Sequence, residues 1–204
     1  MTYIDMLLEN LRKEVELTGR SGSDCIYRSN LSFTFSCEDF EVPSEADYDA
    51  ATVDFYWFLS CSKTGVVGPH SAPQTSFWLN FFGSKALPYG YTWRLNELYN
   101  TLRNPDKWRR AMLYNPTPSD NPPCVVCYQF STDGGREVDC TVTMRSCDMA
   151  KVLPQDVVMS WMLLRHVCQE VKMQPGQLTF NIGNAHVYYA DAGYQEENVI
   201  DGLD

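Results

Sequence analysis

Apolar residues recur along the chain at two spacings, which together predict a mixture of helices and strands. Over residues 4–15 they lie three and four positions apart, as expected of an amphipathic helix. Thr2 and Asp5 are placed like a capping box at the start of this helix, and Gly19 is expected to end it. Residues 31–37 instead alternate between apolar and small polar side chains, which predicts a half-buried strand.

The rest of the chain continues this mixture. A glycine-containing turn at 133–135 is expected to join two strands into a hairpin, and residues 62–92 are the longest irregular stretch, a candidate for ligand-binding loops. The expected helices lie within 43–61, over 95–103 and from Pro154 to about Met173; the expected strands cover 110–114, 124–130, 138–144 and 178–189. These elements predict one α+β domain over residues 1–204.

The charge balance limits the partners of such a domain. With 26 acidic and 16 basic residues, the formal net charge is -10, so long-range attraction to nucleic acid or to an anionic membrane is not expected. A small anion would have to be bound locally, by the arginines that make up most of the basic residues. There is neither a long apolar stretch nor a signal-peptide pattern, and we therefore expect a cytoplasmic protein.

The eight cysteines have irregular spacing, which favours reduced thiols in the core over a disulfide framework. One CxxC pair and three histidines argue against a zinc site, and no metal is expected. Cys124 begins a predicted strand and is, taken alone, either a core thiol or a nucleophile. Arg145, Ser146 and Asp148 come together at a strand end and would suit either an anion site or a surface ion pair.

The order of these motifs narrows the alternatives, because it resembles the pattern of the thymidylate synthase family. The resemblance extends from residue 20 to residue 188. It rests on Pro123-Cys124, Gln129-Phe130, Arg145-Ser146-Cys147-Asp148, Leu153-Pro154 and His186-x-Tyr188, and upstream on Arg20-Ser21-Gly22, Asp54-x-x-Trp57-Phe58-Leu59, Pro88-Tyr89-Gly90-x-x-Trp93-Arg94 and Arg109-Arg110.

The resemblance implies a mixed sheet flanked by helices, which dimerises through the sheet. It also implies that the Cys124 thiolate adds to C6 of a pyrimidine nucleotide and that 5,10-methylenetetrahydrofolate supplies one carbon to C5. Arg145 would bind the phosphate and lower the pKa of the thiol. For the nucleotide, the resemblance implies that Ser146 and Arg20 also bind the phosphate, and that Arg109 and Arg110 bind it across a homodimer interface. It implies that His186 and Tyr188 bind the sugar 3′-hydroxyl and that Gln129 makes a further contact with the nucleotide. The remaining implied roles are folate binding for Asp148 and Trp78 and proton transfer for Tyr89 and Asp54.

One departure from the family pattern bears on the substrate, because Asp156 stands where the family has an asparagine that recognises uracil. Cytosine presents an acceptor at N3 and an amino donor at C4, the reverse of uracil. A carboxyl group can accept from the amino group and, when protonated, share its proton with N3. An ionised carboxylate would oppose uracil O4 lone pair to lone pair. We therefore expect dCMP as substrate, the alternative being that Asp156 only caps the helix that follows Pro154.

An aspartate at this position resembles the deoxycytidylate 5-hydroxymethyltransferases of bacteriophages, in which water rather than hydride completes the reaction. The chain ends soon after Tyr188, without the long segment that covers folate in the synthases, and this is expected to admit water. The other departures are Val125, Val152, Gln155 and Asn184. The alternatives left open are a dCMP methyltransferase, a thymidylate synthase acting on dUMP and an inactive nucleotide-binding homologue.

Overall fold

The computed structural model describes residues 1–38, 40–64, 91–114, 122–132, 134 and 136–193. Helices and strands are interspersed along these residues, as the sequence predicted. In chain order they are α1 (Tyr3–Thr18), β1 (Arg20–Ser21), β2 (Cys25–Ser36), α2 (Tyr48–Thr64), the 3-10 helix η1 (Tyr91–Arg94), α4 (Leu95–Leu102), the 3-10 helix η2 (Trp108–Arg110), β3 (Met112–Tyr114), β4 (Val125–Thr132), β5 (Glu137–Met144), β6 (Cys147–Asp148), α5 (Leu153–Val171) and β7 (Gln174–Tyr188).

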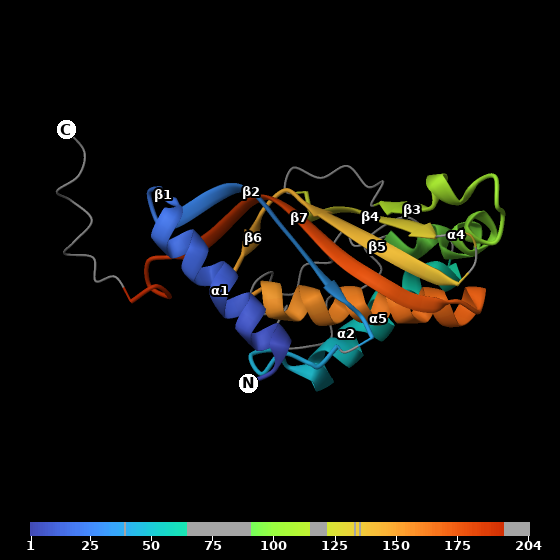
Figure 1. Ribbon diagram of the computed structural model, residues 1–204, viewed down its shortest axis with the longest axis horizontal. Helices are drawn as coiled ribbons and strands as arrows, with labels where there is room; N and C mark the ends of the chain where they lie inside the picture. Colours follow the sequence, from blue (N-terminus) through green and yellow to red (C-terminus); the bar gives the residue numbers. More distant parts are fainter. Residues whose placement is uncertain (39, 65–90, 115–121, 133, 135, 194–204) are drawn as a thin grey trace.

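The strands form one mixed sheet in the order β1-β2-β7-β5-β4-β3, with β6 beside β7. Neighbouring strands run antiparallel except where β5 and β6 pair with β7. Helices α1, α2 and α5 cover one face of this sheet (Figure 1). On the other face, polar side chains of β2 and β7 meet: Ser32 donates to Asn181 over 2.7 Å, and the hydroxyls of Thr34 and Thr179 lie 2.9 Å apart. The single α+β domain is therefore confirmed.

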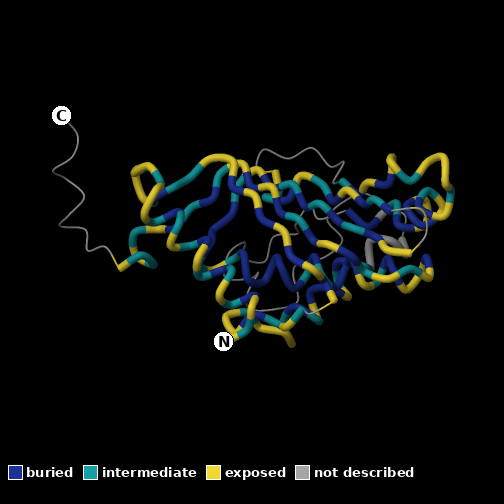
Figure 2. The backbone as a smooth tube through the Cα atoms, viewed as in Figure 1, coloured by how far each residue is buried: buried dark blue, intermediate teal, exposed yellow. Residues whose placement is uncertain are grey.

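The core fills the space between the sheet and α5, the most deeply buried helix (Figure 2). Pro154 lies in the first turn of α5, where its missing N–H costs no hydrogen bond. At the N-terminus of the chain, the capping box is confirmed, because Thr2 accepts from the backbone of Asp5 while the Asp5 carboxylate accepts from the backbone of Thr2. No helix in the described ranges combines the length and the apolar character needed to traverse a lipid bilayer.

In β2 and β7, buried and exposed residues alternate, and in both strands this alternation shifts by one residue at the same position of the ladder. On β2 the buried residues change from an even number, Ile26, to odd numbers from Leu31 onward, and Asn30 between them has a left-handed backbone with φ of 59°. On β7, Ile182 and Ala185 lie on either side of the same change, across from Asn30 in the ladder. Irregularities of this kind re-aim side chains, and they often lie beside functional sites.

Most predicted elements are confirmed, with differences at their ends. The predicted strand over 110–114 shortens to β3 because Arg110 belongs to η2, and β2 begins at Cys25 rather than at Leu31. The short strands β1 and β6 were not predicted, since two residues carry no periodicity. Arg20 lies in β1. Most of the expected loop region, with Trp78 and Tyr89, lies outside the described residues.

Candidate active site

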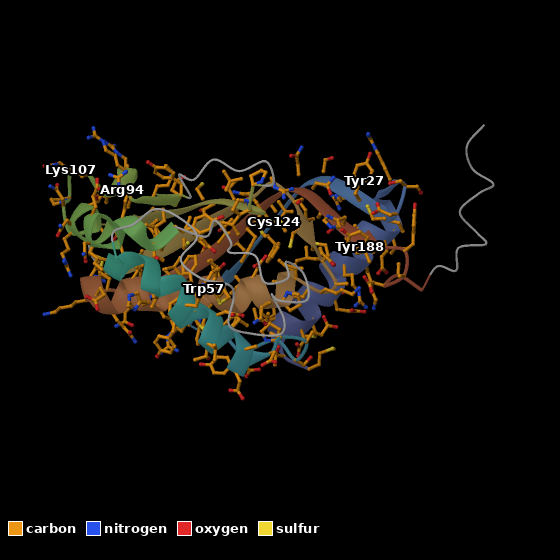
Figure 3. All side chains as sticks on the ribbon, turned by 180° about the vertical axis from the view of Figure 1, so that it is seen from behind. Tyr27, Trp57, Arg94, Lys107, Cys124 and Tyr188 are labelled. Carbon is orange, nitrogen blue, oxygen red and sulfur yellow. The ribbon has the colours of Figure 1, made fainter. Side chains whose placement is uncertain are left out.

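Cys124 lies at the start of β4, near the middle of the molecule, between Tyr27 and Tyr188 on one side and Arg94 and Lys107 on the other (Figure 3). Its carbonyl accepts from the backbone N–H of Arg145 over 2.8 Å, which ties the start of β4 to the end of β5. The next carbonyl, that of Val125, accepts from the buried hydroxyl of Tyr91. Both neighbouring peptide groups are therefore fixed, and the half-buried thiol has a defined position.

Arg145 and Ser146 lie directly beside this thiol. The Ser146 hydroxyl oxygen is 3.8 Å from Cys124 Sγ and accepts from Arg145 Nη1 over 3.2 Å. Arg145 Nε and Nη2 donate to the carbonyl of Pro122 over 3.0 and 2.8 Å. The guanidinium is thus held against the segment that leads into Cys124, and the predicted proximity of Cys124, Arg145 and Ser146 is confirmed.

Arg145 acts to lower the pKa of the Cys124 thiol, as predicted, but the pKa is raised overall. Burial raises the pKa of the Cys124 thiol, and the charge of Asp156 raises it further. The Ser146 hydroxyl and the Arg145 charge both act to lower the pKa, as the sequence argument expected, but they do not outweigh the first two effects. The ligand-free protein therefore holds Cys124 mainly as the thiol at neutral pH.

Asp156 lies in the first turn of α5 and is only 9% exposed. Burial alone raises the pKa of its carboxyl to about 7. Its charge acts on Cys124 and Cys147, which places the carboxyl near the nucleophile. Within the described residues, its side chain makes no hydrogen bond and no ion pair, and Val152, the residue at the helix start, has no side-chain cap. The alternative that Asp156 caps the helix is therefore not what the structure shows.

Tyr128 is a polar neighbour of Asp156 that the sequence analysis did not identify. Its ring packs edge-on against Tyr91 and Phe58, with centroids 5.6 and 6.3 Å apart. Burial raises the pKa of its hydroxyl, and the charge of Asp156 adds to that shift, while Ser160, one turn further along α5, opposes it. The only sequence signal was its place four residues after Cys124, which strand alternation assigns to the core.

A second group of predicted residues lies in one row across the sheet. Arg20 on β1 is paired with Tyr27 on β2, Tyr27 with His186 on β7, and His186 with Asp148 on β6. Paired residues of neighbouring strands have side chains on the same face, so the ladder itself aligns these four. Tyr27 was not predicted to belong to this row, because its position there depends on strand register rather than on a local motif.

The end of this row at His186 and Asp148 lies in the same region as Cys124. The His186 and Tyr188 rings meet edge to face with centroids 5.2 Å apart. Burial raises the pKa of the Tyr188 hydroxyl, and the charges of Asp148 and Cys124 contribute, so these side chains share one region. Asp148 is 6% exposed; its Oδ1 accepts from the backbones of Ala150 and Lys151, while its Oδ2 has no partner among the described residues. A buried acceptor of this kind is suited to a ligand that donates N–H groups.

The site therefore combines a thiol, a guanidinium, a buried carboxyl and a row of polar side chains. A family model described as thymidylate synthase matches residues 1–200 of this chain. The chain belongs to the thymidylate synthase family. Members of this family transfer one carbon from methylenetetrahydrofolate to a pyrimidine nucleotide, so this chain is related to one-carbon transferases.

The thymidylate synthase resemblance named three further residues that the protomer does not bring to Cys124. Arg109 and Arg110 are exposed in η2 and form no ion pair within the described part of the chain. Figure 3 places the adjacent Lys107 at the opposite end of the molecule from Tyr188. Gln129 is exposed on β4, on the opposite face from Tyr128 and Phe130. Their roles in nucleotide binding stay predictions.

The predicted proton-transfer residues are Asp54 and Tyr89, and only Asp54 lies within the described residues. Asp54 is completely buried in α2, one helical turn before Phe58, whose carbonyl accepts from the Thr92 hydroxyl over 2.7 Å. This bond joins α2 to η1, which is joined to β4 by Tyr91. Among the described residues, no group of three His, Cys, Asp or Glu side chains is placed to hold a metal ion.

Proposed function

We propose that this protein is a folate-dependent dCMP hydroxymethylase. The observation that carries this proposal is the buried carboxyl of Asp156, which lies near Cys124 and has no hydrogen bond or ion pair within the described residues. A buried polar group without a protein partner is costly unless a ligand satisfies it. The nucleotide base is the expected ligand, because the neighbouring Cys124 adds to this base in the proposed reaction.

A carboxyl group at position 156 can satisfy both polar groups at the N3 and C4 edge of cytosine. Because the pKa of Asp156 is raised to about 7, the carboxyl is neutral in a large fraction of molecules at neutral pH. A neutral carboxyl can donate its proton to cytosine N3 and accept from the C4 amino group, which uses both oxygens. Uracil would be opposed by the ionised carboxylate, since one of its oxygens would face O4 lone pair to lone pair.

The remaining side chains support the same reaction. In this proposal Cys124 adds to C6 of the base, Arg145, Ser146 and Arg20 bind the phosphate, and His186 and Tyr188 bind the sugar. Methylenetetrahydrofolate supplies the one-carbon unit. Asp148 fits the folate, since its buried Oδ2 is an acceptor without a partner among the described residues and the pterin ring carries N–H donors.

A buried amide next to Asp156 supports completion of the reaction by water. Gln155 is completely buried, and its Oε1 has no partner among the described residues, whereas its Nε2 donates to the carbonyl of Asp47 over 3.4 Å. A bound water is the usual partner of such an oxygen. The resemblance places a phenylalanine at this position in the family, and an apolar ring would exclude that water. Addition of water to the methylene carbon gives 5-hydroxymethyl-dCMP and tetrahydrofolate.

We also propose that the protein acts as a homodimer. The face of the sheet opposite α1, α2 and α5 provides a surface for a second protomer, and the exposed Arg109 and Arg110 form no ion pair in the described part of the chain. In the family resemblance, this arginine pair reaches the phosphate of the neighbouring site.

The test is tritium release from dCMP and dUMP labelled at C5, with methylenetetrahydrofolate present. We expect release from dCMP to be faster, to require the folate and to be lost in Cys124→Ser. Asp156→Asn should move the preference toward dUMP, because an amide suits uracil. An unchanged dCMP to dUMP ratio in Asp156→Asn would refute the role of this residue, and faster turnover of dUMP by the wild type would indicate a thymidylate synthase.

Mass spectrometry of the product separates the two dCMP reactions. A hydroxymethyl product contains one oxygen atom more than a methyl product. The methyl product, formed together with dihydrofolate, would show that hydride completes the reaction and would refute the role of water. If no product forms and no tritium is released, the protein is an inactive nucleotide-binding homologue.

A further inference from the structure

Asp148 ends β6, and the turn that follows it, residues 149–152, orients its carboxylate. The N–H of Met149 donates to the carbonyl of His186 over 2.8 Å, which ties the start of this turn to β7. Oδ1 of Asp148 accepts from two backbone N–H groups of the turn over 3.0 and 3.1 Å. The position of the other oxygen, the buried Oδ2 that has no partner among the described residues, therefore depends on the position of this turn.

The same turn is also held by an ion pair. Lys151 Nζ lies 2.7 Å from Oδ1 of Asp191, which belongs to the turn that follows β7. The Asp191 side chain is only 18% exposed. Within the described residues, Lys151 is the one partner of its carboxylate, because Oδ2 of Asp191 has none. The pair therefore joins the turn after β6 to the turn after β7 through side chains.

Asp191 is itself anchored by its own turn. Its N–H donates to the carbonyl of Tyr188 over 2.9 Å. The next residue of β7's exit, Tyr189, donates its hydroxyl to the carbonyl of Gly22, between β1 and β2, over 3.1 Å. These bonds hold the turn after β7 against the neighbouring hairpin. The Asp191 carboxylate is thus a fixed point to which the Lys151 side chain is attached.

We propose that the ion pair between Lys151 and Asp191 positions Asp148 for folate binding, so that both members of the pair are positioning residues of the one-carbon transfer. This inference rests on the proposed role of Asp148 in binding folate. Without the pair, the turn after β6 loses its side-chain attachment, and the Asp148 carboxylate samples more orientations. Folate binding then costs more conformational entropy, because the carboxylate has to be ordered when the ligand binds.

The competing account is that Lys151 binds folate directly, since folate carries glutamate carboxylates that an ammonium group attracts. The two accounts differ in the sign of one effect. In the direct account, removal of the Asp191 charge frees Lys151 and strengthens folate binding. In the positioning account, the same change weakens folate binding, because the turn loses its attachment.

The KM for methylenetetrahydrofolate, measured by tritium release at saturating dCMP, distinguishes these accounts. Lys151→Met and Asp191→Asn should each raise this KM about three- to fivefold, as expected for a partly exposed ion pair, while kcat and the KM for dCMP change little. Lys151→Arg retains the ion pair and should keep the KM close to that of the wild type. The double variant should have no higher KM than either single variant, because both substitutions remove the same interaction.

Lys13→Met is the matched control. Lys13 pairs with Glu9 over 3.0 Å within α1, so this substitution also removes one lysine charge and one ion pair but leaves the turn after β6 intact. Its KM for folate should equal that of the wild type. A lower KM in Asp191→Asn would overturn the positioning role in favour of direct binding. Additive effects in the double variant, or an equal rise in the KM values for both substrates, would also overturn it.

Calorimetry of tetrahydrofolate binding separates this inference from the choice of nucleotide, because it needs no turnover. With a pyrimidine nucleotide bound, Lys151→Met should bind tetrahydrofolate about three- to fivefold more weakly than the wild type. In Asp148→Ala, the further change Lys151→Met should have no effect, because the residue that the pair positions is absent. An effect that persists there would refute the inference.

The same measurement keeps the two proposals distinguishable. If the wild type turns over dUMP and not dCMP, the dCMP hydroxymethylase proposal fails, and the binding experiment is carried out with dUMP and the same expected result. If the wild type binds no tetrahydrofolate with either nucleotide, the role of Asp148 is refuted and this inference with it.

Discussion

Asp156 should make the protein less stable as the pH rises, which is opposite to the behaviour of a salt-bridged carboxyl. In the unfolded chain its pKa is close to the ordinary value of 3.8, and in the folded protein burial raises it to about 7. Below both values the carboxyl is neutral in both states and has no effect. Between them only the unfolded chain releases the proton, so stability falls with pH, and above about 7 the loss is complete.

The size of this penalty follows from the shift. A difference of about three pH units corresponds to a free energy of unfolding lower by about 4 kcal/mol at pH 8 and by about 2 kcal/mol at pH 5. Asp156→Asn keeps the shape of the side chain and removes its titration. Its stability relative to the wild type should therefore increase by roughly 2 to 3 kcal/mol between pH 5 and pH 8.

Urea unfolding of the nucleotide-free proteins, at equal protein concentration and at both pH values, measures this difference. Asp49→Asn, which removes an exposed carboxyl from the first turn of a different helix, should show no comparable change. An advantage of Asp156→Asn that is equal at the two pH values, or smaller at the higher one, would show that Asp156 is not held neutral by burial.

Two further substitutions test the framework around the site. In Gly183→Ala the new Cβ would lie 2.9 Å from the carbonyl oxygen of Arg145, so the backbone beside Arg145 has to shift. We therefore expect calorimetry to show weaker binding of dCMP. Binding as tight as in the wild type would contradict this reasoning. Thr2→Ala removes the side-chain half of the capping box and should cost about 1 kcal/mol in urea unfolding without changing turnover, because the lost hydrogen bond joins Thr2 only to the first turn of α1. A loss of turnover at unchanged stability would contradict the second prediction.

Local patterns were sufficient to predict the helices and strands in which apolar residues recur with the period of a helix or a strand. The alternation over 138–144 predicted β5, and the buried residues Val138, Cys140, Val142 and Met144 confirm it. Helix α5 was predicted from Pro154 and a long apolar pattern. Such patterns depend only on the geometry of one element, which is the same in every protein. The reversal of alternation at Asn30 and Gly183 was not predicted, because it arises from the pairing of two strands far apart in the sequence.

The sequence by itself determined the types of residue that the site contains and, through their order, the family. It placed Cys124 beside Arg145 and Ser146, and it drew attention to Asp156 as the departure from the family pattern. Only the tertiary structure decided the electrostatic state of these groups. The pKa of a carboxyl or a thiol depends on burial and on neighbours from other elements, and here burial and Asp156 outweigh Arg145 at Cys124. The sequence shows which ionisable residues are present, whereas their pKa values depend on burial and on distances that only the folded chain sets.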